Sequence, residues 1–186
     1  MAYHLIFEGA ELAGKSWIMS QVYEYLENKF GNSTDILNGC HWFNADIGVY
    51  GTEHGKNVIK NYINIFEEIR DKNIIVEKLF ISDLVYNELY SNKKINYSKE
   101  IKRLRKENFK IIFVKFPEDE KVLEKRIEDR LNIYPHYRKI LKKPSWYIKQ
   151  QKLYKERLIE SGLDFLEIET KILPDQSIVK KIINWI

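Results

Sequence analysis

The residues most able to do chemistry lie close together near the start of the chain. They fit the pattern G-x-x-x-x-G-K-[ST] at every constrained position: Gly9, Ala10, Glu11, Leu12, Ala13, Gly14, Lys15 and Ser16. Glycines let such a loop curl until its N–H groups point at phosphate oxygens. The lysine can then reach the terminal phosphates, and the serine hydroxyl can ligate Mg²⁺. We therefore expect the loop to bind ATP with Mg²⁺, and we expect Lys15 to be catalytic.

A carboxylate and an ammonium group follow a second apolar run. Glu77 and Lys78 come directly after Ile74-Ile75-Val76. Ligands of open α/β sheets bind at the carboxyl ends of the strands. Glu77 is therefore a candidate catalytic residue, either through Mg²⁺ or as a base toward an acceptor hydroxyl, and a candidate metal ligand together with Ser16.

Three arginines in the second half of the chain could neutralise phosphate charge. Arg126 and Arg130 are four residues apart, so they share one face of a predicted helix. Arg138 follows in a polar, basic and aromatic segment, 131–143. Cationic groups that close over a transferring phosphoryl group stabilise its developing charge. We expect Arg126 and Arg130 to be catalytic and Arg138 to contact substrate.

The loop motif alone fits kinases, GTPases and motors. A GTPase needs an [NT]-K-x-D motif to read guanine, and the two nearest candidates, Asn92-Lys93-Lys94-Ile95 and Asn28-Lys29-Phe30-Gly31, lack the Asp. The length of 186 residues argues against a motor. A Ras-like GTPase is therefore disfavoured.

Composition is typical of one folded domain in a reducing compartment. The chain is 44% hydrophobic and 31% charged, with a net charge of +4, which excludes disorder. Cys40 is the single cysteine, so an internal disulfide is impossible. The sequence shows neither a signal peptide nor a membrane-spanning run, so we expect a cytoplasmic protein with no membrane partner.

Apolar runs alternate with helical spacing along the chain. Strands are predicted at residues 3–7, 33–37, 74–76, 110–116 and 164–168. Helices are predicted near 17–26, 56–69, 82–90, 98–107, 118–131, 144–161 and 178–186. Residues 38–55 are predicted to form a loop, whose Trp42, Phe43 and Tyr50 could stack on a nucleobase. The alternation predicts a parallel sheet with helices on both faces.

Three stretches resemble thymidylate kinases. Phe7-Glu8-Gly9 is similar to that family's F-E-G opening. The run IIVEKLFISDLVYN, residues 74–87, resembles its strand ending in D-R-Y-x-x-S-x-x-A-Y-Q, and also the E-R-S-x-x-S-D segment of deoxynucleoside kinases. Residues 123–130 resemble L-x-R-I-x-x-R.

The resemblance implies one P-loop kinase domain over residues 1–186, with a short lid at about 131–143. It implies a three-layer α/β/α fold with a five-stranded parallel sheet in the order 2-3-1-4-5. Family members are often dimers, so a homodimer is a further expectation. With the aromatic Phe43, the implied substrate-binding residues are Glu8, Lys78, Tyr86, Asn87 and Arg138.

Three functions remain open at this point. The first is ATP-dependent phosphorylation of a (deoxy)nucleoside monophosphate, as in thymidylate kinases. The second is phosphorylation of a nucleoside 5′-hydroxyl, which Glu77 favours because deoxynucleoside kinases carry Glu there. The third is a nucleotide-binding or polynucleotide kinase module, in which the basic stretches 99–106 and 139–143 would contact a phosphate backbone. We expect a small-molecule acceptor rather than a nucleic acid.

Overall fold

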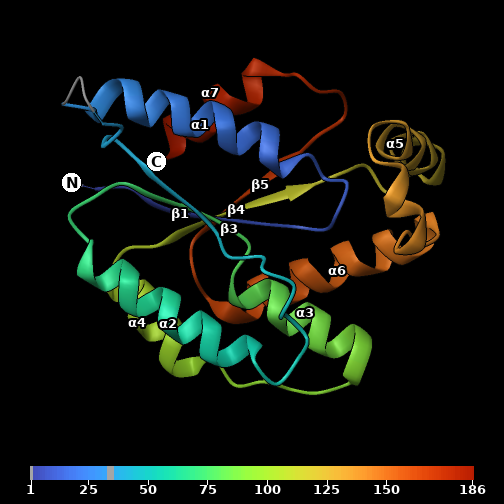
Figure 1. Ribbon diagram of the computed structural model, residues 1–186, viewed down its shortest axis with the longest axis horizontal. Helices are drawn as coiled ribbons and strands as arrows, with labels where there is room; N and C mark the ends of the chain where they lie inside the picture. The colour runs from blue at the N-terminus through green and yellow to red at the C-terminus, as the bar shows by residue number, and fades with distance from the viewer. Residues whose placement is uncertain (1, 33–35) are drawn as a thin grey trace.

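The computed structural model describes residues 2–32 and 36–186. Its centre is a parallel sheet with the strand order β2-β3-β1-β4-β5, as predicted (Figure 1). The strands are β1 (His4–Glu8), β2 (His41–Asn44), β3 (Ile74–Glu77), β4 (Lys110–Lys115) and β5 (Phe165–Glu169). The helices are α1 (Lys15–Phe30), α2 (Gly55–Glu68), α3 (Phe80–Ser91), α4 (Ser98–Lys106), α5 (Glu120–Ile133), α6 (Pro144–Ser161) and α7 (Gln176–Trp185), with a 3₁₀ turn η1 (Pro135–Lys139).

Helices cover both faces of the sheet, which confirms the three-layer architecture. Helices α1 and α7 lie together on one face, and α2, α3, α4 and α6 lie on the other (Figure 1). Helix α5 and η1 stand at one end of the sheet, beyond the carboxyl ends of the strands. No helix in the described part of the chain is long and apolar enough to cross a membrane.

Strand β1 forms the centre of the core because it pairs with β3 on one side and β4 on the other. All five of its residues are buried. The three in the middle are apolar, and the two polar residues, His4 and Glu8, stand at its ends. Doubly covered parallel strands are buried on both faces, which explains the continuous apolar runs. The carboxyl end of β1 leads directly into the phosphate-loop motif.

The second strand is not where the sequence predicted it. Residues 33–35 of the predicted strand 33–37 lie outside the described residues, and Ile36 and Leu37 are exposed and not in a strand. Strand β2 lies instead within the predicted loop 38–55. Within the described chain it is an edge strand of four residues that pairs with β3, and its burial alternates along the strand. Pairing, rather than a β-branched run, therefore makes this segment a strand.

Candidate functional site

The phosphate-loop motif forms the connection between β1 and α1. Gly9 and Gly14 have φ values of +144° and +81°, and a Cβ on Gly9 would collide with the carbonyl of Val114. Leu12 also has a positive φ, of 67°. Only glycine adopts such angles at low cost, so the two fixed glycines of the motif are needed for the loop to curl in front of α1.

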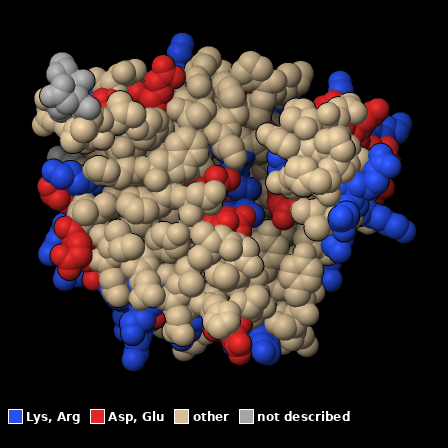
Figure 2. Space-filling view, in the orientation of Figure 1, with Lys and Arg blue, Asp and Glu red and all other residues tan. Residues whose placement is uncertain are grey.

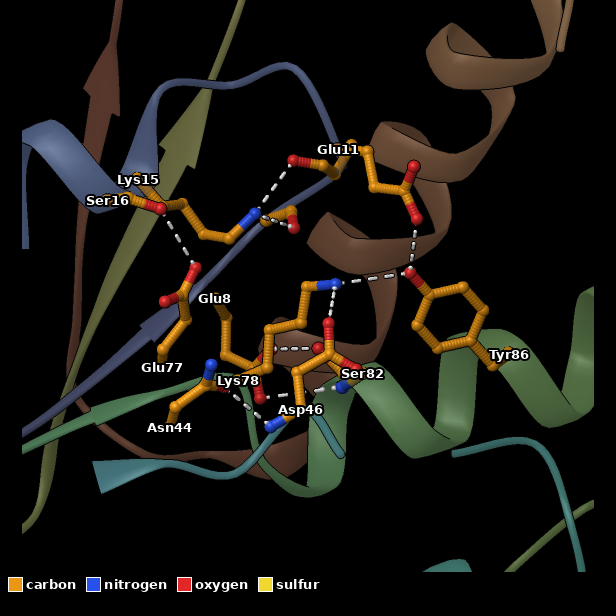
Figure 3. Close-up of polar contacts among 12 residues, drawn as sticks. Glu8, Glu11, Lys15, Ser16, Asn44, Asp46, Glu77, Lys78, Ser82 and Tyr86 are labelled. Atoms are coloured by element: carbon orange, nitrogen blue, oxygen red, sulfur yellow. Dashed lines mark hydrogen bonds and ion pairs between the residues drawn. The ribbon is translucent and has the colours of Figure 1, made fainter. Parts of the chain in front are cut away.

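Lys15 begins α1 and turns its side chain back across the loop (Figure 3). Its Nζ donates to the carbonyl oxygens of Gly9 and Ala10, at 2.9 Å each. Only 6% of the residue is exposed. Burial, followed by the nearby charge of Lys78, lowers the pKa of Lys15 to about 8. The ammonium group therefore lies inside the loop in surroundings that a phosphate charge would make more favourable.

Ser16 and Glu77 are brought together from α1 and the end of β3. The Ser16 hydroxyl donates to Glu77 Oε1 at 3.2 Å (Figure 3). Mg²⁺ in nucleotide sites is commonly held by one or two protein oxygens plus phosphates. No cluster of three or more His, Cys, Asp or Glu side chains suited to a metal occurs among the described residues. This pair of oxygen donors therefore fits a Mg²⁺ shared with phosphates rather than an all-protein metal site.

Lys78 sits at the start of the β3–α3 turn with a φ of 56°. Its buried Nζ forms an ion pair with Asp46 Oδ2 at 2.5 Å and lies 3.3 Å from the hydroxyl of Tyr86. Tyr86 in turn donates to Glu11 Oε1 at 3.0 Å. Burial alone would lower the pKa of Lys78, but Tyr86 and Asp46 outweigh it and hold the pKa above its ordinary value. The strained turn thus places a fully charged lysine beside the phosphate loop (Figure 3).

Sequence reasoning missed Asp46. It lies in the segment predicted to be a loop, two residues beyond the end of β2, and its N–H donates to Asn44 Oδ1 at 3.0 Å. An acidic residue just after the carboxyl end of a strand is the signal that would have identified it. The sequence does not give this signal, because it predicts the second strand at residues 33–37 rather than at β2.

Glu8 lies beneath the loop rather than facing a ligand. It has no exposed surface, and its carboxylate accepts from the Leu79 N–H at 2.8 Å and from the Ser82 hydroxyl at 2.6 Å. Burial raises its pKa to about 7, although these hydrogen bonds act in the opposite direction. The expectation that Glu8 contacts substrate does not match this position. Its carboxylate instead anchors the first turn of α3 to β1.

The predicted arginines occupy different surroundings. Arg126 donates to Leu12 O at 2.8 Å and to both the side chain and the carbonyl of Thr170, so it ties the phosphate loop to the end of β5. Arg130 lies over the rings of Tyr137 and Tyr134, with its Cζ 4.6 and 5.5 Å from the two centroids. Arg138 is exposed on η1. The structure thus does not bring Arg126 and Arg130 to a common target, although one helix carries both.

Two predicted substrate-binding residues contact core groups rather than residues of the phosphate loop. Phe43 packs edge-on against Phe66 and Tyr62, with centroids 5.2 and 6.5 Å apart. Asn87 is buried and donates to the carbonyl and carboxylate of Asp83 at 2.9 Å. Both side chains therefore support the core. Tyr86, which precedes Asn87 in the sequence, does contact Lys78 and Glu11 of the site.

A cavity of about 390 Å³ opens beside the loop. It is lined by Glu11, Asp46, Gly48, Tyr50, Tyr86, Tyr90, Ile140, Lys142, Trp146 and Tyr147. Figure 2 shows a hollow on this face with acidic and basic side chains at its floor. The volume and the mixture of aromatic and polar lining are typical of a small-molecule site. A larger hollow of about 550 Å³, between α3, α4 and α6, contains no residue of the phosphate loop.

Comparison with solved structures shows which known proteins share this fold. No family model matches the sequence, and no curated protein matches it. Among solved structures, the YorR protein from Bacillus subtilis, in complex with phosphorylated GDP, is similar at a TM-score of 0.68 and 18% identity, over 97% of this chain and 94% of that one. Deoxyadenosine kinase from M. mycoides with bound dCTP is similar at a TM-score of 0.56 and 17% identity, over 100% and 98%.

Thymidylate kinase from Ehrlichia chaffeensis is similar at a TM-score of 0.57 and 12% identity, over 99% of this chain and 98% of that chain. These identities support the fold rather than a particular substrate. The chain therefore has, over nearly its whole length, the P-loop fold of a thymidylate kinase and a deoxyadenosine kinase.

Proposed function

We propose that the protein is an ATP-dependent kinase that phosphorylates a hydroxyl group of a nucleoside. The carrying observation is the charge of the cavity beside the loop. Its described lining contains two carboxylates, Glu11 and Asp46, against one cation, Lys142. Lys78, which adjoins it, is already paired with Asp46. The charges of these four groups cancel, so they leave no excess of cations to bind a dianionic monophosphate, whereas a neutral hydroxyl needs none.

The donor side of the reaction follows from the loop. Its N–H groups and Lys15 would hold the phosphates of ATP at the N-terminus of α1. Ser16 and Glu77 would hold Mg²⁺, which neutralises phosphate charge when bound. Arg126 keeps the loop in place through Leu12 O. These groups position the γ-phosphoryl group, and positioning with charge neutralisation accounts for most of the catalysis of phosphoryl transfer.

The acceptor side depends on Asp46. Oδ2 of this carboxylate accepts from Lys78, and the second oxygen accepts no hydrogen bond from the described part of the chain. This second oxygen can take the proton from the acceptor hydroxyl. At the same time the acceptor oxygen bonds to the γ-phosphorus, and the bond between the γ-phosphorus and the oxygen that bridges it to the β-phosphate breaks, which releases ADP. Lys78 holds the carboxylate in position. The predictions for Arg130 and Arg138 fit a lid over the donor phosphates, and we retain them as part of the proposal.

The test is a kinase assay over matched nucleosides and their 5′-monophosphates, with wild type and Asp46→Asn. We expect nucleosides to be phosphorylated, and we expect the substitution to lower kcat by about 10² to 10⁴, as removal of a general base does. Asp71→Asn is the matched control, because Asp71 forms an exposed ion pair with Lys72 at 2.9 Å. Phosphorylation of monophosphates alone would show that the acceptor is a phosphate and that the first function predicted from the sequence is right.

A further inference from the structure

One buried hydroxyl that lines the acceptor cavity has no hydrogen-bond partner in the described part of the chain. Tyr50 lies between β2 and α2, lines the cavity, and is 8% exposed. Its hydroxyl is buried, and no hydrogen-bond partner reaches it among the described residues. A buried polar group that is left unpaired destabilises a folded protein, so such groups are rare and call for a physical explanation. A ligand in the cavity would supply the missing partner.

The Tyr50 hydroxyl can act only as a neutral donor or acceptor. Burial raises the pKa of this phenol, and the charges of Glu8 and Asp46 raise it further. The proton therefore stays on the oxygen at any physiological pH. A neutral phenol can donate one hydrogen bond, so an acceptor atom on a ligand would suit it.

The backbone around Tyr50 is held firmly against α3. The Gly51 N–H donates to Asp83 Oδ1 at 2.9 Å, and Tyr97 donates to the other oxygen of the same carboxylate at 2.7 Å. Gly51 has a φ of +80°, and a Cβ added there would lie 3.0 Å from Tyr86 Cβ. The backbone next to Tyr50 is therefore packed closely against α3. A hydroxyl fixed in this way is preorganised for a ligand.

Aromatic side chains form another part of the same cavity lining. The rings of Tyr86 and Tyr90 are nearly parallel, 7° apart in orientation with centroids 5.8 Å apart. Trp146 lies next to Tyr90 at 6.1 Å. Flat aromatic groups that line a cavity favour a planar, aromatic ligand. The lining thus offers aromatic surface together with one buried hydroxyl that has no hydrogen-bond partner among the described residues.

We propose that Tyr50 determines base specificity: its hydroxyl donates a hydrogen bond to a carbonyl oxygen or ring nitrogen of the acceptor's nucleobase. This inference rests on the proposed function, in which a nucleoside occupies the cavity. It assigns the phenol a role in binding rather than in the phosphoryl transfer. Removing the oxygen should therefore change KM for the acceptor and leave kcat nearly unchanged.

The test is Tyr50→Phe, which deletes only the unpaired oxygen. We expect KM for the preferred nucleoside to rise about tenfold, with kcat within about threefold and KM for ATP unchanged. We expect the melting temperature of the free protein to stay the same or rise, because no protein hydrogen bond is lost. Tyr97→Phe is the matched control for stability, because it removes a buried hydroxyl that donates to Asp83, and its melting temperature should fall.

Tyr25→Phe, on α1 and outside the cavity lining, controls for activity and should change neither KM. The role of Tyr50 is refuted if Tyr50→Phe lowers the melting temperature as Tyr97→Phe does, or if acceptor KM is unchanged. These outcomes are separable from a failure of the proposed function. If wild type phosphorylates only monophosphates and Tyr50→Phe still raises their KM about tenfold, the nucleoside assignment fails and the role of Tyr50 stands.

Discussion

The protonation state of Lys15 should control the affinity for ATP at alkaline pH. Burial and the charge of Lys78 lower its pKa to about 8 from an ordinary value of 10.5. Bound phosphates would place several negative charges around the ammonium group and return its pKa toward or above the ordinary value. Above pH 8, ATP binding must then take up a proton at Lys15. The affinity for ATP should therefore fall about tenfold per pH unit up to about pH 10.5, which is a loss of about 3 kcal/mol of binding free energy in all.

The same lowered pKa has the opposite effect on the free protein. Between about pH 8 and 10.5 the unfolded chain binds more protons at Lys15 than the folded chain does. Stability therefore rises with pH across this interval, because the buried lysine no longer has to be charged in the folded state. A comparison of wild type with Lys15→Met, by thermal unfolding at several pH values, isolates this contribution from that of other groups.

Isothermal titration calorimetry measures the proton uptake directly. Binding enthalpies at pH 9 in two buffers with different ionisation enthalpies should differ by the equivalent of nearly one proton per ATP, and at pH 7 the difference should be near zero. Lys15→Arg is the matched control, since a guanidinium keeps its charge throughout this range. An affinity that stays flat from pH 8 to 10, or a net release of protons, would contradict the reasoning that Lys15 meets the phosphates.

Three further substitutions test Glu8 and the two arginines of α5. As pH rises from 4.5 to about 7, wild type should lose up to about 3 kcal/mol of stability, because the folded state keeps the Glu8 proton that the unfolded chain loses. Glu8→Gln should abolish this pH dependence, and melting temperature against pH measures it. Arg126→Ala should raise KM for ATP about tenfold with a smaller change in kcat, because the hydrogen bonds to Leu12 O and Thr170 are lost. Arg130→Ala should instead lower kcat, and steady-state kinetics distinguish the two substitutions.

Most of the fold could be predicted because its information is local. The run Ile74-Ile75-Val76 is β-branched and apolar, and such a segment suits a strand covered on both faces. Strand β2, His41–Asn44, carries no comparable pattern. Its extended state depends on hydrogen bonds to β3 at one edge of the sheet, which a single sequence does not display. The error in β2 then hid Asp46 and the cavity beside it.

The site was predictable where its residues are adjacent in sequence. The phosphate loop met this condition, because one short motif contains both the glycines that bend it and the lysine. Trp146 and Tyr50, by contrast, line one cavity although nearly a hundred residues separate them. Arg126 shows another limit of sequence reasoning. Helical spacing places it on a face with Arg130, but only the folded chain reveals that Leu12 O and Thr170 accept its hydrogen bonds.

Two buried lysines distinguish the donor side of the site from the acceptor side. The ammonium group of Lys78 contacts a carboxylate, that of Asp46, so its charge is compensated within the protein and its pKa is raised. The ammonium group of Lys15 is bonded to neutral carbonyl oxygens, and its pKa is lowered. A lysine that already has its counter-charge serves to hold that carboxylate in place. A lysine that gains its counter-charge only with a ligand favours anion binding, and Lys15 is therefore the residue that should meet the phosphates of ATP, while Asp46 remains fixed for the acceptor hydroxyl.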